Sequence, residues 1–191
     1  MKSSTNTVEA EARLGRRSDD QDVDDDDRGS AEYERILAEN LRYVEAFDRS
    51  ALTAAPLSGL AVLACMDARL DVEEALGLRT GDAHIIRNAG GLATDDAIRS
   101  IIVSQHLLGT NEVLVIGHTK CGLLGADENA LRDRLERETG QRVELALGSF
   151  ADLDESVRAQ VERLRAHPWV SRVPIHGLVF EVESGRLFEI A

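Results

Sequence analysis

Apolar and polar positions divide the chain from residue 31 onward into short segments with two different periodicities. Continuous apolar runs predict strands at 60–65, 83–87 and 112–117. Apolar positions at helical spacing predict helices at 31–49, 71–77, 95–108, 126–138 and 152–166. Two final apolar runs, 178–182 and 187–190, predict a hairpin that turns at Ser184-Gly185. Because strands alternate with helices, the pattern predicts an α/β fold with a mainly parallel β-sheet flanked by helices.

Capping residues support several of these boundaries. Ser30 and Thr94 precede the helices that they are expected to cap, and their hydroxyls suit the unpaired N–H groups of a first helical turn. Gly77 and Gly109 follow the last apolar positions of two helices and are expected to end them.

The first thirty residues differ in character from the rest. Residues 18–28 form a strongly acidic run with almost nothing to bury, so we predict a disordered acidic tail over 1–30. We expect a linker at 50–59 and a single α/β domain over 31–191.

Composition excludes several classes of protein. A net charge of −13 argues against a nucleic-acid-binding protein, which needs a basic face. The chain has no continuous apolar stretch long enough to span a membrane, and its N-terminal residues have no apolar signal core. We therefore expect a cytoplasmic protein that binds neither nucleic acid nor membranes. In the cytosol, cysteines are more often metal ligands or catalytic groups than disulfides.

The chain has two cysteines: Cys65 ends the first predicted strand, and Cys121 comes shortly after the strand predicted at 112–117. Cys65 is followed by Asp67 and Arg69, and Cys121 comes three residues after His118. Polar groups at the ends of parallel strands form the ligand sites of open α/β sheets. Thiolate and imidazole ligands suit zinc, which in catalytic sites has three protein ligands and one exchangeable position. Asp67 could be a fourth ligand or could pair with Arg69 and leave the metal open; a disulfide between the cysteines is the alternative to a metal.

The two motifs together, C-x-D-x-R and H-x-x-C, resemble the β-class carbonic anhydrase family over residues 31–190. Arg87-Asn88-Ala89-Gly90-Gly91 lies between them. The similarity is greatest to a small bacterial branch that is also similar to carbonyl sulfide hydrolases. The resemblance implies one zinc ion per chain, held by Cys65, His118 and Cys121 in a β-carbonic anhydrase-like fold. It also implies catalytic roles for Asp67 and Arg69, with Asp67 a zinc ligand in a closed state only and pH selecting the state.

The resemblance implies reversible hydration of carbon dioxide to bicarbonate by zinc-bound hydroxide, with activity that rises with pH. A hydrolase of carbonyl sulfide or carbon disulfide on the same scaffold is one alternative. A non-catalytic zinc-binding protein is another. Larger members of the family have a bicarbonate-binding glutamine in the strand before C-x-D-x-R, and residues 57–64 contain none.

The resemblance also suggests further features of the site and the assembly. It places Asn88, Ala89 and Gly90 in the wall of the substrate pocket, with tight turn packing as the alternative and little weight on Gly91. It implies a homodimer or homotetramer, with the 31–49 helix and the final hairpin as candidate interfaces. Lys120 is expected to be solvated. The remaining histidines are expected to be structural or exposed: His84, His106, His167 and His176.

Overall fold

The computed structural model describes residues 31–191, so the predicted acidic tail over 1–30 lies outside the described residues. The chain divides after Ser50 into two units. In the first, helix α2 (Ala31–Glu45) ends four residues earlier than predicted, and none of its residues is buried. Its apolar residues Tyr33, Ile36, Leu37, Leu41 and Val44 are all exposed.

The second unit contains a five-stranded sheet whose strand order is β2-β1-β3-β4-β5. The first four strands are parallel, and β5 runs antiparallel to β4. Their bounds are β1 Leu60–Cys65, β2 Ala83–Asn88, β3 Glu112–His118, β4 Ile175–Glu181 and β5 Arg186–Glu189. The predicted α/β class and mainly parallel sheet are therefore confirmed.

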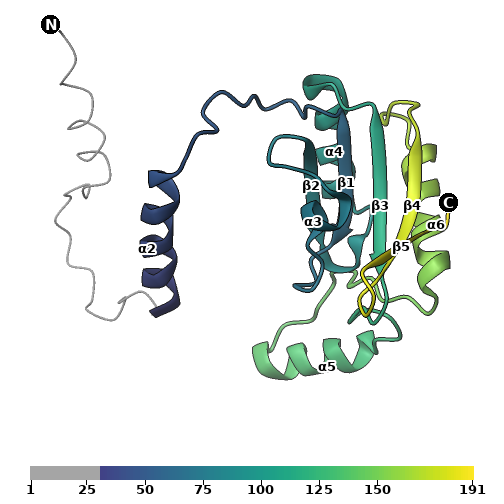
Figure 1. Cartoon of the computed structure of the whole chain (residues 1–191). Coiled ribbons are helices and arrows are strands. Elements are labelled where there is room, and N and C mark those ends of the chain that lie inside the picture. Colours follow the sequence, from purple (N-terminus) through teal and green to yellow (C-terminus); the bar gives the residue numbers. More distant parts are fainter. Residues whose placement is uncertain (1–30) are drawn as a thin grey trace, which may run out of the picture. The chain divides into compact units, whose positions relative to one another are not determined.

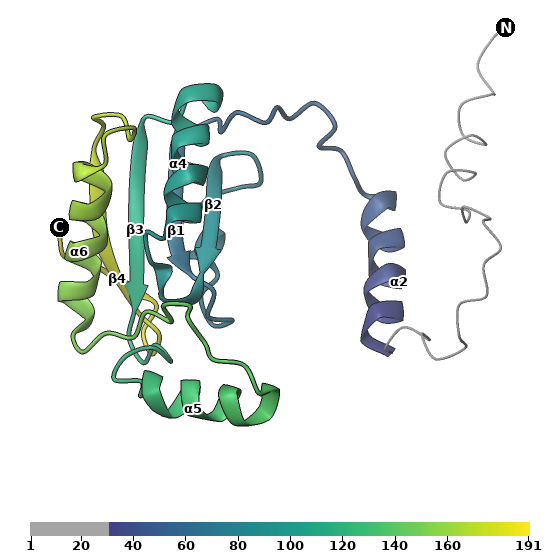
Figure 2. The same cartoon turned by 180° about the vertical axis from the view of Figure 1, so that it is seen from behind.

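Helices α4 (Asp95–Leu108) and α6 (Leu153–Ala166) cover one face of this sheet, whereas the short α3 (Val72–Leu76) lies on the other (Figures 1 and 2). The cores follow the alternation of the strands, because successive side chains point to opposite faces. Leu63 of β1 packs with Ile101 and Val161 on the two-helix side. Val62 packs with Val72 on the α3 side.

Local chemistry determines where the helices begin and end. The Thr94 side chain accepts a hydrogen bond from the Ala97 N–H, and Gly109 ends α4 in the left-handed conformation. Asp71 caps α3 in the same way, and Gly77 ends it. A further helix, α5 (Glu128–Thr139), is capped by Asp127 and has no buried residue. None of the described helices is long and apolar enough to cross a membrane.

One predicted boundary was wrong by three residues. We expected a strand from 178, but β4 begins at Ile175, which pairs with Val113 of β3. Gly177 interrupts the apolar run there, and the structure shows why it is a glycine. A Cβ at Gly177 would lie 2.8 Å from Val157 of α6, and one at Gly117 of β3 would lie 2.7 Å from the same side chain. The two glycines let α6 pack directly against the sheet.

Candidate metal centre

The sheet topology brings the two cysteine-containing segments together. From β1 the chain continues to β2 on one side, and β3 lies on the other side, so the strand order reverses beside β1. Ligands of open α/β sheets bind at such a reversal, beyond the carboxyl ends of the strands. Cys65 is the last residue of β1, and His118 is the last residue of β3. Cys121 lies in the turn that follows.

The ligand atoms of Cys65, His118 and Cys121 all lie within 4.8 Å of one another. The three residues are buried, with exposed fractions of 4%, 1% and 8%. Tetrahedral zinc with bonds of about 2.0–2.3 Å needs its ligand atoms roughly 3.5 Å apart, which small side-chain movements provide here. Both cysteines are free thiols. In the described part of the chain, this is the one such cluster with metal-ligand spacing.

The orientation of His118 fits a metal ligand. Its Nδ1 lies 2.9 Å from the Thr119 carbonyl oxygen, and because a carbonyl only accepts, the proton is assigned to Nδ1. Nε2 is buried among the other candidate ligands, with the Cys65 sulfur as its neighbour, and no other group is bonded to it. Its lone pair is therefore free for a metal, with the second nitrogen oriented by the backbone as in many metal-binding histidines. Sequence reasoning missed Thr119. Its N–H donates to the Phe180 carbonyl oxygen, and its hydroxyl accepts a hydrogen bond from the Val182 N–H.

The two thiols differ in acidity. Burial raises the pKa of Cys65, but the His118 imidazole and the backbone N–H groups of Asp67 and Gly90 outweigh it and bring that pKa to about 7. Burial raises the pKa of Cys121, and the nearby Cys65 sulfur adds to the rise. Cys65 is therefore the more readily ionised of the two ligands, and a bound cation would favour the thiolate of both.

Asp67 and Arg69 form a tight pair beside this cluster. The Arg69 guanidinium donates to both carboxylate oxygens, from Nε at 2.9 Å and from Nη2 at 2.8 Å. Hydrogen bonds from this guanidinium and from the Arg69 N–H hold the pKa of Asp67 well below its usual range. One of the same oxygens, Oδ2, lies 3.8 Å from the Nε2 of His118. Asp67 is thus paired with Arg69, while its Oδ2 lies about as far from His118 Nε2 as two ligand atoms of one metal lie from each other.

The turn between the two downstream ligands is constrained at Lys120. This residue has a φ of 55°, in a region that favours glycine. Its carbonyl oxygen accepts a hydrogen bond from Arg69 Nη2 at 3.1 Å, and its ammonium group forms an ion pair with Glu183. We expected a solvated lysine, and its side chain is 62% exposed. The structure shows in addition that this residue links the turn to Arg69 and to the β4–β5 turn.

The segment 87–91 packs against the same centre. Arg87 donates from Nε to the Cys65 carbonyl oxygen at 3.0 Å and from Nη2 to that of Asp67 at 2.7 Å. The Asn88 side chain bonds to the backbone of Leu92 in both directions, which closes the turn. These contacts show that Asn88 stabilises the turn. That Asn88, Ala89 and Gly90 line the substrate pocket stays a prediction.

Gly91 is more constrained than the sequence indicated. It has a φ of +64°, and a Cβ there would lie 3.0 Å from the Cys65 nitrogen and 3.0 Å from the Ile116 carbonyl oxygen. Neither atom can move away from such a Cβ, because both belong to the backbone of central strands.

We therefore expect Gly91→Ala to lower the free energy of unfolding by about 2–5 kcal/mol, through the positive φ and the overpacking together. Gly109→Ala is the matched control, since Gly109 has a φ of +79° with nothing within 4 Å of its Cβ position. That variant should lose only about 1–2 kcal/mol. Urea unfolding of both variants measures the difference, and equal losses would contradict the packing argument.

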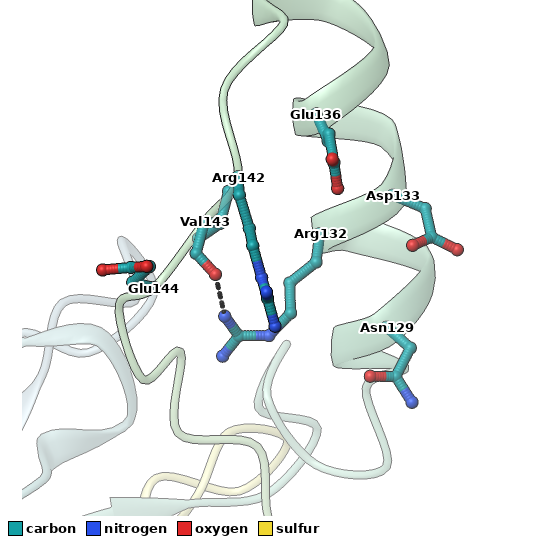
Figure 3. A pocket seen from close by; sticks show the side chains of 7 residues that line it. All are labelled: Asn129, Arg132, Asp133, Glu136, Arg142, Val143 and Glu144. Carbon is teal, nitrogen blue, oxygen red and sulfur yellow. Dashed lines mark hydrogen bonds between the residues drawn. The ribbon is translucent and has the colours of Figure 1, made fainter.

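Two of the surface hollows in the described part of the chain are lined by neither cysteine. One of about 740 Å³ is formed by α5 and the segment after it. Figure 3 shows the Arg132 and Arg142 guanidinium groups converging there, with Arg132 bonded to the Val143 carbonyl oxygen. Three acidic residues share this lining, Asp133, Glu136 and Glu144, so its charges are mixed and the hollow favours no anion. A second, of about 500 Å³, lies between the starts of α4 and α6.

The other histidines are bonded away from the centre. His84 is held by the Ser104 hydroxyl at 2.7 Å and the Ala54 carbonyl oxygen at 2.8 Å, and so connects the 50–59 segment to β2. His106 Nε2 lies 2.9 Å from the Trp169 carbonyl oxygen. His176 lies 3.4 Å from Glu112, and His167 packs its ring edge-on against Trp169.

Comparison with known proteins gives consistent matches. The family model described as "Carbonic anhydrase" matches residues 60–187. The β-carbonic anhydrase 1 of Mycobacterium tuberculosis is 41% identical over 155 residues, which cover 81% of this chain and 94% of that protein. A carbon disulfide hydrolase of Acidithiobacillus thiooxidans is 42% identical over 147 residues, covering 66% of this chain and 74% of that protein. The crystal structure of carbonic anhydrase from Streptococcus mutans superposes with a TM-score of 0.80 at 35% identity, covering 85% of this chain and 99% of that one.

Proposed function

The chain belongs to the β-carbonic anhydrase family, and from that premise we propose that it binds one zinc ion and catalyses the reversible hydration of carbon dioxide to bicarbonate. One observation carries the proposal: three buried ligand side chains converge, and an ionised carboxylate held by an arginine lies beside them. A bound zinc ion would lower the pKa of a coordinated water and so supply hydroxide near neutral pH.

The residues of the chain have separate tasks in this proposal. Cys65, His118 and Cys121 hold the metal and leave a fourth position. Two thiolates would cancel the charge of a bound divalent cation, so such a centre would acidify water less than a neutral three-histidine site would. Asp67 would compensate by accepting a hydrogen bond from a water at that position and so orienting it toward the substrate carbon. Arg69 keeps the carboxylate ionised and away from the metal.

Hydrolysis of carbon disulfide or carbonyl sulfide is the second candidate. It is supported by the 42% identity with a carbon disulfide hydrolase. These substrates are also linear and apolar, with an electrophilic carbon between two heteroatoms, so the same residues in the same roles would suffice. The shape of the path to the metal, rather than the ligand set, would separate the two activities.

Stopped-flow hydration of carbon dioxide by the zinc-loaded protein at pH 8.5 tests the proposal, with carbon disulfide and carbonyl sulfide assayed in parallel. Fast hydration with slow sulfide release supports a carbonic anhydrase. The reverse result assigns the chain to the hydrolases. If one zinc ion is bound per chain and neither activity is present, the centre is closed and the protein is non-catalytic.

We also propose that the chain forms a homodimer or homotetramer in the cytoplasm through α2 and the final hairpin. The exposed apolar side chains of α2 support this, because burying one such side chain contributes about 1.5–3 kcal/mol. Leu41, for example, is 63% exposed.

We expect Leu41→Asp to lower the molecular mass measured by sedimentation to that of a smaller species, since a buried carboxylate without a partner is strongly unfavourable. Arg42→Gln is the control, because it changes the net charge by the same amount on the polar face of α2. An unchanged mass for Leu41→Asp would mean that α2 is not an interface.

A further inference from the structure

Arg87 is a charged side chain that contacts the metal centre only through the backbone. It stands near the end of β2, paired in register with Ala64 of β1. Its two hydrogen bonds reach the carbonyl oxygens of Cys65 and Asp67, which are two residues apart and so lie on the same side of the extended chain. One guanidinium therefore fixes the main chain on both sides of Met66.

The main chain at Asp67 is held from several directions. Its carbonyl oxygen accepts from Arg87 and also from the Leu70 N–H at 3.0 Å. Its N–H is directed at the Cys65 sulfur. Only the side chain retains a choice of partner, between the Arg69 guanidinium and the metal position.

That choice depends on a short distance. Asp67 Oδ2 is bonded to Arg69 at 2.8 Å and lies 3.8 Å from His118 Nε2, about the spacing of two ligands of one metal. A small displacement of the Asp67 backbone would therefore favour one partner over the other, and misplacements of about 1 Å have large effects on catalysis.

We propose that Arg87 is a positioning residue which, by holding the carbonyl oxygens of Cys65 and Asp67, keeps the Asp67 carboxylate on Arg69 and the fourth ligand position open. The inference rests on the proposed role of Asp67, and it does not depend on which substrate the enzyme hydrates.

The test uses the full-length protein loaded with Co²⁺, whose visible absorption reports coordination, titrated with thiocyanate as a probe of the open position. If Arg87→Met lets Asp67 occupy that position, the apparent dissociation constant rises in inverse proportion to the open fraction. We expect a rise of about fivefold or more with one cobalt ion still bound per chain. Arg87→Lys, which can reach only one of the two carbonyl oxygens, should show a smaller rise.

A double variant separates positioning from a direct effect. On an Asp67→Ala background no carboxylate competes for the metal, so Arg87→Met should leave thiocyanate binding unchanged. Arg132→Met on α5 is the matched control, because Arg132 also donates to a backbone carbonyl oxygen, that of Val143. It should not alter the thiocyanate titration.

The proposal is overturned if Arg87→Met binds thiocyanate like the parent protein. It is also overturned if affinity falls equally with and without Asp67, because Arg87 would then act on the ligands or on the anion itself. Should Arg87→Met fail to fold, Arg87→Lys decides, and an unchanged dissociation constant for it overturns the proposal. Since the readout is anion binding to cobalt, a protein without carbon dioxide hydration still gives an answer.

Discussion

Replacing Cys65 or Cys121 by serine is expected to remove zinc and turnover together. A serine hydroxyl does not ionise near neutral pH, so either change leaves only two good ligands for the metal. Loss of a residue that merely orients a ligand already weakens metal affinity by about 10–100-fold, and loss of a ligand itself should exceed that. Zinc content measured by mass spectrometry after dialysis, together with stopped-flow hydration, tests this expectation.

Met66→Ser is the matched control for the cysteine variants. Met66 also has a sulfur-containing side chain and adjoins Cys65, but it is 65% exposed and is not one of the three proposed ligands. It should keep both zinc and activity. Circular dichroism of the metal-free proteins shows whether a serine variant has simply unfolded. A Cys121→Ser protein that keeps stoichiometric zinc and full turnover would rule out the proposed ligand set.

Asp67→Ala is expected to have the opposite pattern, with zinc retained and turnover lost. The three ligand side chains are untouched, so the metal content should stay at one per chain. Without the carboxylate, the water at the fourth position loses the group that orients it and accepts its hydrogen bond, and positioned acid–base groups contribute about 10²–10⁴-fold to rate. We expect the turnover number for hydration to fall by about a hundredfold or more, measured by stopped flow.

Asp71→Asn provides the comparison for a nearby carboxylate. Asp71 accepts a hydrogen bond from the Glu74 N–H as the cap of α3, and asparagine caps a helix equally well. Its turnover should equal that of the parent protein. Full activity in Asp67→Ala would refute the role given to Asp67, whereas loss of zinc in that variant would make Asp67 a permanent ligand.

Local patterns were sufficient to predict most of the elements. The strand at 60–65 and the helix at 95–108 have the predicted bounds, because neighbouring residues determine both. The strand is one apolar run, and the helix has Thr94 as its cap and Gly109 just beyond its last turn. The start of β4 could not be read in this way. Gly177 looks like a break in the sequence, and only its contact with α6 shows that it belongs to a central strand.

The same division applies to the site. The predicted ligands Cys65, His118 and Cys121 converge because each lies at or just beyond a strand end, a position that the sequence pattern predicts. The contacts of Arg87 and the close packing of Gly91 depend on the register between β1, β2 and β3, which no single segment determines. Sequence reasoning alone assigns no role to Arg87 and places little weight on Gly91.

The two central strands that end in proposed metal ligands, β1 and β3, also determine how a bound metal would affect the lifetime of the folded chain. A ligand that binds only the folded state suppresses opening in proportion to its concentration over its dissociation constant. Amide hydrogen exchange in β1 and β3 should therefore slow when zinc is bound, whereas α5, with no buried residue, exchanges by local fraying and should not respond. Metal supply would then govern how long a chain survives proteolysis, as well as whether it turns over substrate.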